Sequence, residues 1–204
     1  MQLMYFLILI FSIIVHEVAH GYAADRLGDP TARYAGRLTL NPLPHIDMLG
    51  SIILPLLSIV TPGSFLFGWA KPVPYNPYNL TKAPRWGEAI VAAAGPLTNL
   101  LLSLMFALLV RMSSDTAFMQ ICFIGVAVNV WLAALNLIPI PPLDGSKILP
   151  MFLPHGLARQ YREWRLRMDH NPVLGLLFIL VFFALFGGYI SPLVYELAKI
   201  IAGL

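Results

Sequence analysis

The sequence His16-Glu17-Val18-Ala19-His20 follows directly on an apolar run that extends from Leu3 to Val15. If the whole stretch is helical, the two imidazoles are four residues apart and lie one above the other on the same helix face. They can then bind one metal ion. The carboxylate of Glu17 can reach a water molecule on that ion without being a ligand itself, which is the HExxH arrangement of zinc sites on helices.

A simpler interpretation of the motif is a helix end whose polar side chains reach headgroup water. A charged group well inside a bilayer costs about 2.5 to 3.5 kcal/mol or more and usually marks a functional site, which favours metal binding. Cys122 is the only cysteine, so the chain has no internal disulfide and no thiolate cluster. Any zinc must therefore be held by histidine and carboxylate.

The composition is that of an integral membrane protein. Of the 204 residues, 58% are hydrophobic and only 11% are charged, and the mean hydropathy is +0.76. This length allows about four to six spans of roughly 20 residues. We therefore expect residues 1–204 to form one intramembrane domain, surrounded by a lipid bilayer and without a nucleic-acid partner; the oligomeric state stays open. No basic residue precedes the first apolar run, which favours a retained helix over a signal peptide.

The predicted fold class is an all-α polytopic membrane protein with a re-entrant segment and a short β-hairpin. The re-entrant segment and the hairpin are expected within residues 48–75. Glycine and proline after residue 186 leave open whether residues 189–204 continue the last helix or form a separate one. Long helices are predicted over residues 3–24, which carry the motif, 88–110, 118–138 and 173–203.

Residues 48–75 are expected to enter the membrane and return to the same side. Their apolar run is broken by Pro55 and by Thr61-Pro62-Gly63, which suggests a helix over about 49–60 followed by a turn. Residues 64–75 are rich in aromatic residues and contain two prolines. This pattern suits an edge strand or a hairpin better than a helix, and such a strand could hold an extended peptide by main-chain pairing.

Two histidines leave a catalytic zinc ion in need of a third protein ligand, with water in the fourth position. Asp144 is the best candidate. It follows a helix that is ended by prolines, and irregular backbone at membrane depth must be buried in protein or line a cavity. The alternative is an ordinary Asp-Gly turn at the surface. For Asp144 to meet the histidines, residues 48–75 must not cross the membrane completely.

The basic residues provide an independent test of this topology. With a re-entrant segment, 11 of the 13 Lys and Arg residues lie on one side of the membrane, together with the metal ligands. The positive-inside rule assigns that side to the cytoplasm. A full span would instead divide the basic residues more evenly. The 11 residues are Arg26, Arg33, Arg37, Lys71, Lys82, Arg85, Lys147, Arg159, Arg162, Arg165 and Arg167.

Two polar segments carry further features. In residues 25–47, His45 and Asp47 are possible extra ligands or gate residues, although a solvated loop histidine is the interpretation that we prefer for His45. Residues 155–170 combine four arginines with Tyr161 and Trp164. That mixture is typical of a helix lying on an anionic membrane surface.

The motifs resemble those of the site-2 proteases, which are intramembrane zinc metallopeptidases, and in particular the compact prokaryotic branch without a PDZ domain. Residues 16–20, Gly95-Pro96-Leu97-Thr98-Asn99, and residues 136–145 (Asn-Leu-Ile-Pro-Ile-Pro-Pro-Leu-Asp-Gly) match in order across nearly the whole chain. The resemblance implies one Zn²⁺ on His16, His20 and Asp144. It also implies that Glu17 is the catalytic acid and base and that Asn136 steadies the oxyanion or the substrate backbone.

The resemblance also implies a substrate site and a class of partner. Asn99 matches a supporting polar position, and we group it with Phe67, Trp69 and Val73 as candidate substrate-binding residues. The expected substrates are membrane-spanning proteins, cleaved in regulated intramembrane proteolysis at a prokaryotic cytoplasmic membrane.

Two other classes of function stay open on the sequence. A membrane metal transporter or sensor could use the same side chains to bind an ion, and it would tolerate Glu17→Gln. A noncatalytic scaffold could keep the fold only to hold partner helices, although the intact set of candidate ligands argues against it.

Overall fold

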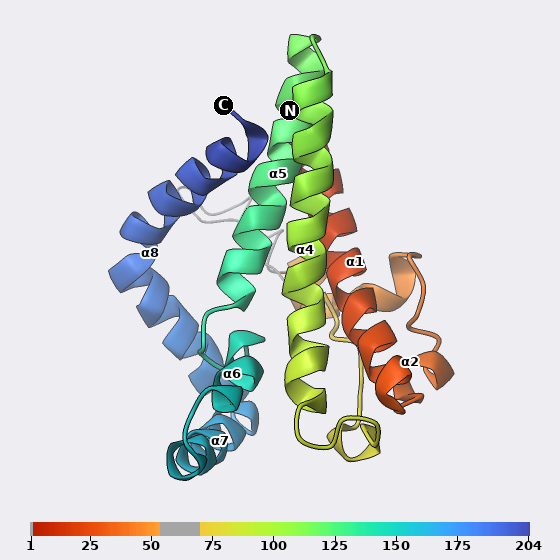
Figure 1. Cartoon of the computed structure of the whole chain (residues 1–204), viewed down its shortest axis with the longest axis vertical. Helices are drawn as coiled ribbons and strands as arrows, with labels where there is room; N and C mark the ends of the chain where they lie inside the picture. Colours follow the sequence, from red (N-terminus) through yellow and green to blue (C-terminus); the bar gives the residue numbers. More distant parts are fainter. Residues whose placement is uncertain (1, 54–69) are drawn as a thin grey trace.

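The computed structural model of the chain describes residues 2–53 and 70–204 (Figure 1). Within these residues, four helices are long and apolar enough to cross a membrane, which confirms an all-α, multi-pass membrane protein. Their bounds agree with the predicted helices to within a few residues. They are α1 (Gln2–Leu27), α4 (Gly87–Met112), α5 (Thr116–Asn136) and α8 (Pro172–Ala202).

The last helix is continuous, which answers the question that the sequence left open. α8 includes Pro192 and bends part-way along its length in Figure 1. It ends at Gly203, whose φ of 81° is the left-handed conformation that glycine adopts without strain. Residues 189–202 are therefore part of α8 and not a separate helix.

The long helices pack through small side chains and leave large apolar side chains on the outside. A core between α4, α5 and α8 is formed by alanine, valine and cysteine, including Ala107, Val126 and Ala198. On α4 the outward side chains Leu101, Leu104 and Leu108 are more than half exposed. Small residues let helix backbones approach closely, whereas lipid can cover the leucines.

Shorter elements connect the long helices. Figure 1 shows α2, α6 and α7 at the same end of the bundle as the end of α1 and the start of α4. The end of α5 also lies there, so α1 and α5 end on the same side of the bundle. The shorter elements are α2 (Thr31–Tyr34), η1 (Leu43–His45), η2 (Met48–Ile53), η3 (Pro77–Asn79), α6 (Gly145–Ile148), η4 (Leu149–Met151) and α7 (His155–Asp169).

The predicted re-entrant segment is not supported by the described residues. Where a helix over residues 49–60 was expected to begin, the described residues form only the short π-helix η2. The remainder of that predicted helix, its turn at residues 61–63, and both Phe67 and Trp69 lie outside the described residues.

The predicted β-hairpin is wrong where it can be examined, because residues 70–75 form no strand. Pro72 and Pro74 have no N–H to donate to a ladder. The N–H of Lys71 donates to the carbonyl of His45 (2.9 Å) and the N–H of Val73 donates to Glu17 (2.9 Å). Residues 71–74 therefore have no free N–H with which to pair a neighbouring strand or an extended substrate.

A buried carboxylate fixes this stretch beside the end of α1. Asp29 has no exposed surface and accepts hydrogen bonds from the hydroxyl of Thr31 (2.5 Å), the N–H of Asn76 (2.6 Å) and the side chain of Asn79 (3.0 Å). Burial raises the pKa of Asp29, but these hydrogen bonds lower it by more, so its pKa lies below the usual value and it stays ionised. The loop after α1 and the segment before α4 are thereby joined.

Candidate metal centre

Three side chains from distant parts of the sequence converge between α1 and the start of α6. The Nε2 atoms of His16 and His20 are 3.0 Å apart. The Oδ2 atom of Asp144 lies 3.2 Å from the first and 3.3 Å from the second. Of the groups of His, Cys, Asp and Glu in the described residues, this is the one whose ligand atoms are placed to share a metal ion.

The arrangement fits a zinc ion. A tetrahedral ion with ligand distances of about 2.0 to 2.1 Å has ligand-to-ligand edges of about 3.3 to 3.4 Å, close to the observed separations. The Oδ2 atom of Asp144 is buried and has no hydrogen-bond donor. Burial raises the pKa of Asp144, but contacts with the two imidazoles lower it by more, so its pKa lies well below the usual value and it is a carboxylate. Two imidazoles and one carboxylate leave a fourth position for water.

The backbone before α6 brings Asp144 into this position. Gly145 follows it, and a Cβ atom there would overlap the carbonyl groups of Leu137 and Ile138 at the end of α5. A glycine therefore lets the chain fold back tightly against the end of that helix. The Asp-Gly pair is buried and is not a surface turn.

His20 is oriented by the backbone of α4. Its Nδ1 atom lies 2.7 Å from the carbonyl oxygen of Val91. A carbonyl can only accept, so Nδ1 carries the proton and Nε2 presents its lone pair toward Asp144 and His16. A metal-binding histidine commonly donates its other ring N–H in this way, which fixes the ring and raises its basicity.

His16 is oriented by a chain of buried amides that ends at another carbonyl. Asn129 donates from Nδ2 to the carbonyl of Gly125 (2.9 Å) and to the hydroxyl of Ser12 (2.9 Å). Its Oδ1 therefore accepts from Nδ2 of Asn99 (2.9 Å), and Oδ1 of Asn99 accepts from Nδ1 of His16 (2.5 Å). Each step follows from the one before because amide nitrogens donate and amide oxygens accept. The lone pair of Nε2 again faces the metal position.

Gly95 provides the space for both rings. A Cβ atom at this position would lie 2.5 Å from Nε2 of His20 and 2.6 Å from Nε2 of His16. Val91, Gly95 and Asn99 are spaced by four residues and occupy one face of α4. On that face, the Asn99 side chain contacts His16 and the Val91 carbonyl contacts His20. Gly95, between them, leaves room for both rings.

The predicted catalytic residues have different surroundings. Glu17 is half-buried on α1 between the histidines in sequence, and its Oε2 atom accepts the N–H of Val73 (2.9 Å). Asn136 is the last residue of α5, and its Nδ2 donates to the carbonyl of Leu132 (3.0 Å). Asn99 is fully buried against His16, while Val73 is 5% exposed.

His45 does not have the place that the sequence suggested. It is 2% exposed, its Nε2 atom lies 2.9 Å from the carbonyl oxygen of Thr39, and it is not part of the group that could hold a metal. The interpretation as a solvated loop histidine is wrong, because the ring is packed inside the loop that contacts Lys71. Asp47 accepts the N–H of Gly50 (2.7 Å) in the same loop.

The sequence did not identify Ser12, Asn129 or the carbonyl of Val91 as parts of the site. Asn129 is seven residues from Asn136, a spacing that places both near one face of α5. An asparagine inside a membrane helix is a signal in itself, since buried polar groups in a bilayer need partners. The carbonyl of Val91 leaves no trace in the sequence.

We predict that Asn129→Ala weakens zinc binding about 10- to 100-fold, because Asn99 loses the donor and acceptor pattern that fixes its amide toward His16. Competition with a chromogenic zinc chelator measures the change. Ser103→Ala is a matched control: Ser103 is buried one turn along α4 from Asn99, and its hydroxyl donates to the carbonyl of Leu100 in its own helix. Equal zinc affinity in both variants would contradict the role of the amide chain.

The chain is similar over most of its length to proteins that carry zinc metalloprotease names. It matches peptidase family M50 over residues 4–121. YwhC of Bacillus subtilis, provisionally named as a zinc metalloprotease, is 36% identical over 193 residues, which cover 89% of this chain and 81% of YwhC. Rip2 of Mycolicibacterium smegmatis, named in the same way, is 36% identical over 140 residues, 67% of this chain and 52% of Rip2.

No solved protein structure matches the chain significantly. The resemblance to the site-2 proteases nevertheless agrees with the family match, with these relatives and with a group of side chains arranged for one zinc ion. The chain belongs to peptidase family M50, the site-2 proteases.

Proposed function

We propose that this protein is an intramembrane zinc metallopeptidase that hydrolyses peptide bonds in or near membrane-spanning segments of other proteins. The observation that carries the proposal is the convergence of His16, His20 and Asp144 on one position, with ligand atoms 3.0 to 3.3 Å apart, inside a bundle of membrane helices. Membership of family M50 supports zinc as the metal and proteolysis as the reaction.

Glu17 is the proposed general base and acid. When zinc is bound, it supplies Lewis-acid activation of a water molecule and of the peptide carbonyl. Glu17 accepts the proton of the attacking water and later donates a proton to the departing amine. Its hydrogen bond from the N–H of Val73 orients the carboxylate and leaves Oε1 for this exchange.

Asn136 is the proposed second donor for the oxyanion or the substrate backbone. It lies at the end of α5, eight residues before Asp144. Its Nδ2 donates to the carbonyl of Leu132, one helical turn away, and a primary amide has a second N–H to offer. Hydrogen bonds to a developing oxyanion stabilise it more than they stabilise the ground-state carbonyl.

The proposed location is a prokaryotic cytoplasmic membrane, with the site toward the cytoplasm. Seven of the 11 basic residues assigned to that side by sequence lie at the end of α1 or on α2, α6 and α7, and Figure 1 shows α2, α6 and α7 together at one end of the bundle. The positive-inside rule supports this orientation. The proposed substrates are therefore membrane-spanning proteins that the site meets from its cytoplasmic end.

The proposal is tested with purified protein reconstituted with a single-span substrate. Zinc per chain and the masses of the cleavage products are measured for the native protein and for Asp144→Asn. We expect the native protein to bind zinc and cleave, a chelator to stop cleavage, added zinc to restore it, and the variant to lose both properties. Asp169→Asn, at the exposed end of α7, is the matched control. Zinc transport into the vesicles without cleavage would overturn the proposal.

The contact between Val73 and Glu17 gives a separate prediction. Val73→Pro removes the N–H that donates to Glu17, and we expect turnover to fall about 10- to 100-fold, the value of one hydrogen bond to a charged group. Zinc content should stay unchanged, because Val73 contacts no predicted ligand through this bond. Val73→Ala retains the N–H and should keep most of the turnover. Similar turnover in the two variants would show that this hydrogen bond does not contribute to turnover.

A further inference from the structure

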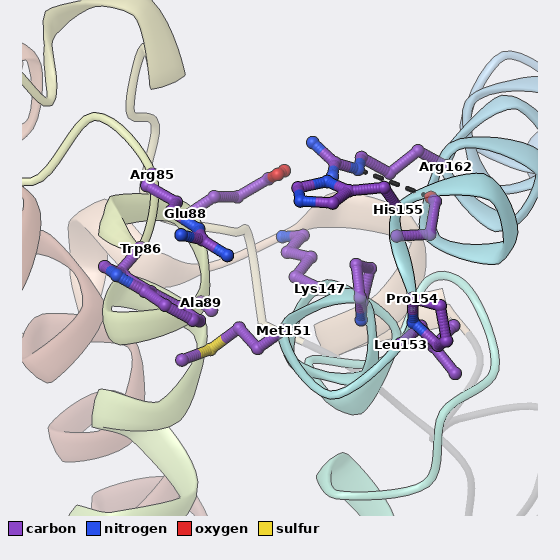
Figure 2. Close-up of a pocket in the computed structure, with 12 residues that line it drawn as sticks. Arg85, Trp86, Glu88, Ala89, Lys147, Met151, Leu153, Pro154, His155 and Arg162 are labelled. Atoms are coloured by element: carbon purple, nitrogen blue, oxygen red, sulfur yellow. Dashed lines mark hydrogen bonds between the residues drawn. The ribbon is translucent and has the colours of Figure 1, made fainter.

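A second polar site lies at the end of the bundle, and its lining does not include His16, His20 or Asp144. It is a cavity of about 130 Å³ between the start of α4, α6 and the start of α7. This is about ten times the volume that a single water molecule needs. Figure 2 shows Arg85 and Trp86 on one side of it, His155 and Arg162 on the other, and Lys147 between them.

The cavity carries an excess of positive charge. Its lining contains three cations, Arg85, Lys147 and Arg162, and one carboxylate, Glu88. The carboxylate is already paired, because its Oε1 atom accepts from Nη2 of the buried Arg165 at 2.7 Å. The three cations of the lining therefore face a single carboxylate, which is shared with Arg165.

The cations remain charged and retain donors for a ligand. Arg85 stacks on the ring of Trp86, with its Cζ atom 4.8 Å from the ring centroid, and this contact leaves the N–H groups at the edge of the guanidinium free. Arg162 uses Nε for the carbonyl of Ala158 (3.4 Å). The Nζ atom of Lys147 lies 5.3 Å from the centroid of the Tyr75 ring, and an ammonium group has three N–H donors to offer.

The surroundings of the cavity are those of a membrane border. It lies where the membrane helix α4 begins and where α7 runs beside the bundle. Trp86, Met151 and Leu153 form apolar parts of its wall, and the neighbouring Phe152 is 77% exposed. A ligand with a phosphate group and an apolar tail can meet both kinds of surface here, because aromatic and basic residues at an interface contact headgroups while apolar side chains contact acyl chains.

We propose that this cavity binds the phosphate headgroup of one anionic phospholipid. Arg85 and Arg162 contact the phosphate from opposite sides, Lys147 contacts it from the floor, and Trp86 and Phe152 lie along the first part of the lipid tails. The bound lipid connects α7 to the start of α4 beside the existing pair of Arg165 and Glu88. The proposal does not rest on catalytic activity.

Native mass spectrometry of the purified full chain counts bound lipid after addition of phosphatidylglycerol or phosphatidylcholine. We expect one strongly retained phosphatidylglycerol per chain and no comparable retention of phosphatidylcholine. Arg85→Gln with Arg162→Gln should reduce the retention about tenfold or more. Arg159→Gln with Arg167→Gln, which removes the same charge from α7 outside the cavity lining, should change it less than about twofold.

Zinc content and the unfolding midpoint of both double variants establish that the fold is retained. Equal loss of lipid in the two double variants would overturn the proposal in favour of diffuse attraction between α7 and the membrane. Equal retention of the two lipids would also overturn it. Displacement of the lipid by inorganic phosphate would identify a free-phosphate site, and displacement by a soluble acidic peptide would identify a protein partner; either result contradicts a lipid site.

Discussion

Glu17→Gln is expected to lower the rate of peptide-bond hydrolysis about 10²- to 10⁴-fold, the usual contribution of a positioned general base. Glutamine has nearly the same shape, and its amide oxygen can still accept the N–H of Val73 as Glu17 does. It cannot accept a proton from water near neutral pH. The zinc content should stay at that of the native protein, because the predicted ligands are His16, His20 and Asp144.

The measurement pairs zinc analysis with single-turnover cleavage of a membrane-spanning substrate. Glu163→Gln is the matched control, since Glu163 forms an exposed pair with Arg159 on α7 and such surface pairs contribute little to stability. The same pair of measurements separates the alternatives left open by the sequence. A metal transporter or sensor would tolerate Glu17→Gln, and a noncatalytic scaffold would show no cleavage in the native chain.

Gly95→Ala is expected to weaken zinc binding about 100-fold or more, and cleavage should be lost with the metal. The added Cβ would lie 2.5 to 2.6 Å from Nε2 of both histidines, closer than nonbonded atoms approach. Neither ring can turn aside easily, because Val91 and Asn99 hold the Nδ1 atoms. The helices α1 and α4 must then separate, which moves the ligands.

Gly188→Ala is the control for this substitution. Gly188 lies in the membrane helix α8, and a Cβ atom there would meet no described atom within 4 Å. In a helix interior, alanine is more favourable than glycine by roughly 0.5 to 1 kcal/mol, so this variant should keep its zinc and its stability. Native zinc affinity in Gly95→Ala would contradict the close approach of the two helices.

Spacing and chain order were enough to predict that the side chains of His16, His20 and Asp144 come together. A four-residue interval places both histidines on the same face of a helix. The prolines before Asp144 predicted irregular backbone, which at membrane depth must be buried in protein or line a cavity. The membrane helices were equally predictable, because a long apolar run has few alternatives to a helix in a bilayer.

The supporting contacts were not predictable in the same way. Asn129 could be picked out in the sequence, but its hydrogen-bond partners could not. They depend on which faces of α1, α4 and α5 are turned toward one another, and a helix that is apolar on all sides does not determine this from its sequence pattern. The strand over residues 64–75 was predicted from aromatic residues and prolines, a pattern whose outcome depends on the neighbours available. Here Glu17 and His45 provide partners for the N–H groups of residues 71–74, and no strand forms in the described part.

The face of α4 formed by Val91, Gly95 and Asn99 makes the metal a reporter of helix register. If α4 slid by one turn against α1, His16 would lose the side-chain acceptor Asn99, and both rings would meet a side chain in place of the glycine. A misassembled chain could therefore not retain the ion with native affinity. Zinc stoichiometry thus serves as an assay of correct assembly in the membrane, and it can be read on variants that have no catalytic activity.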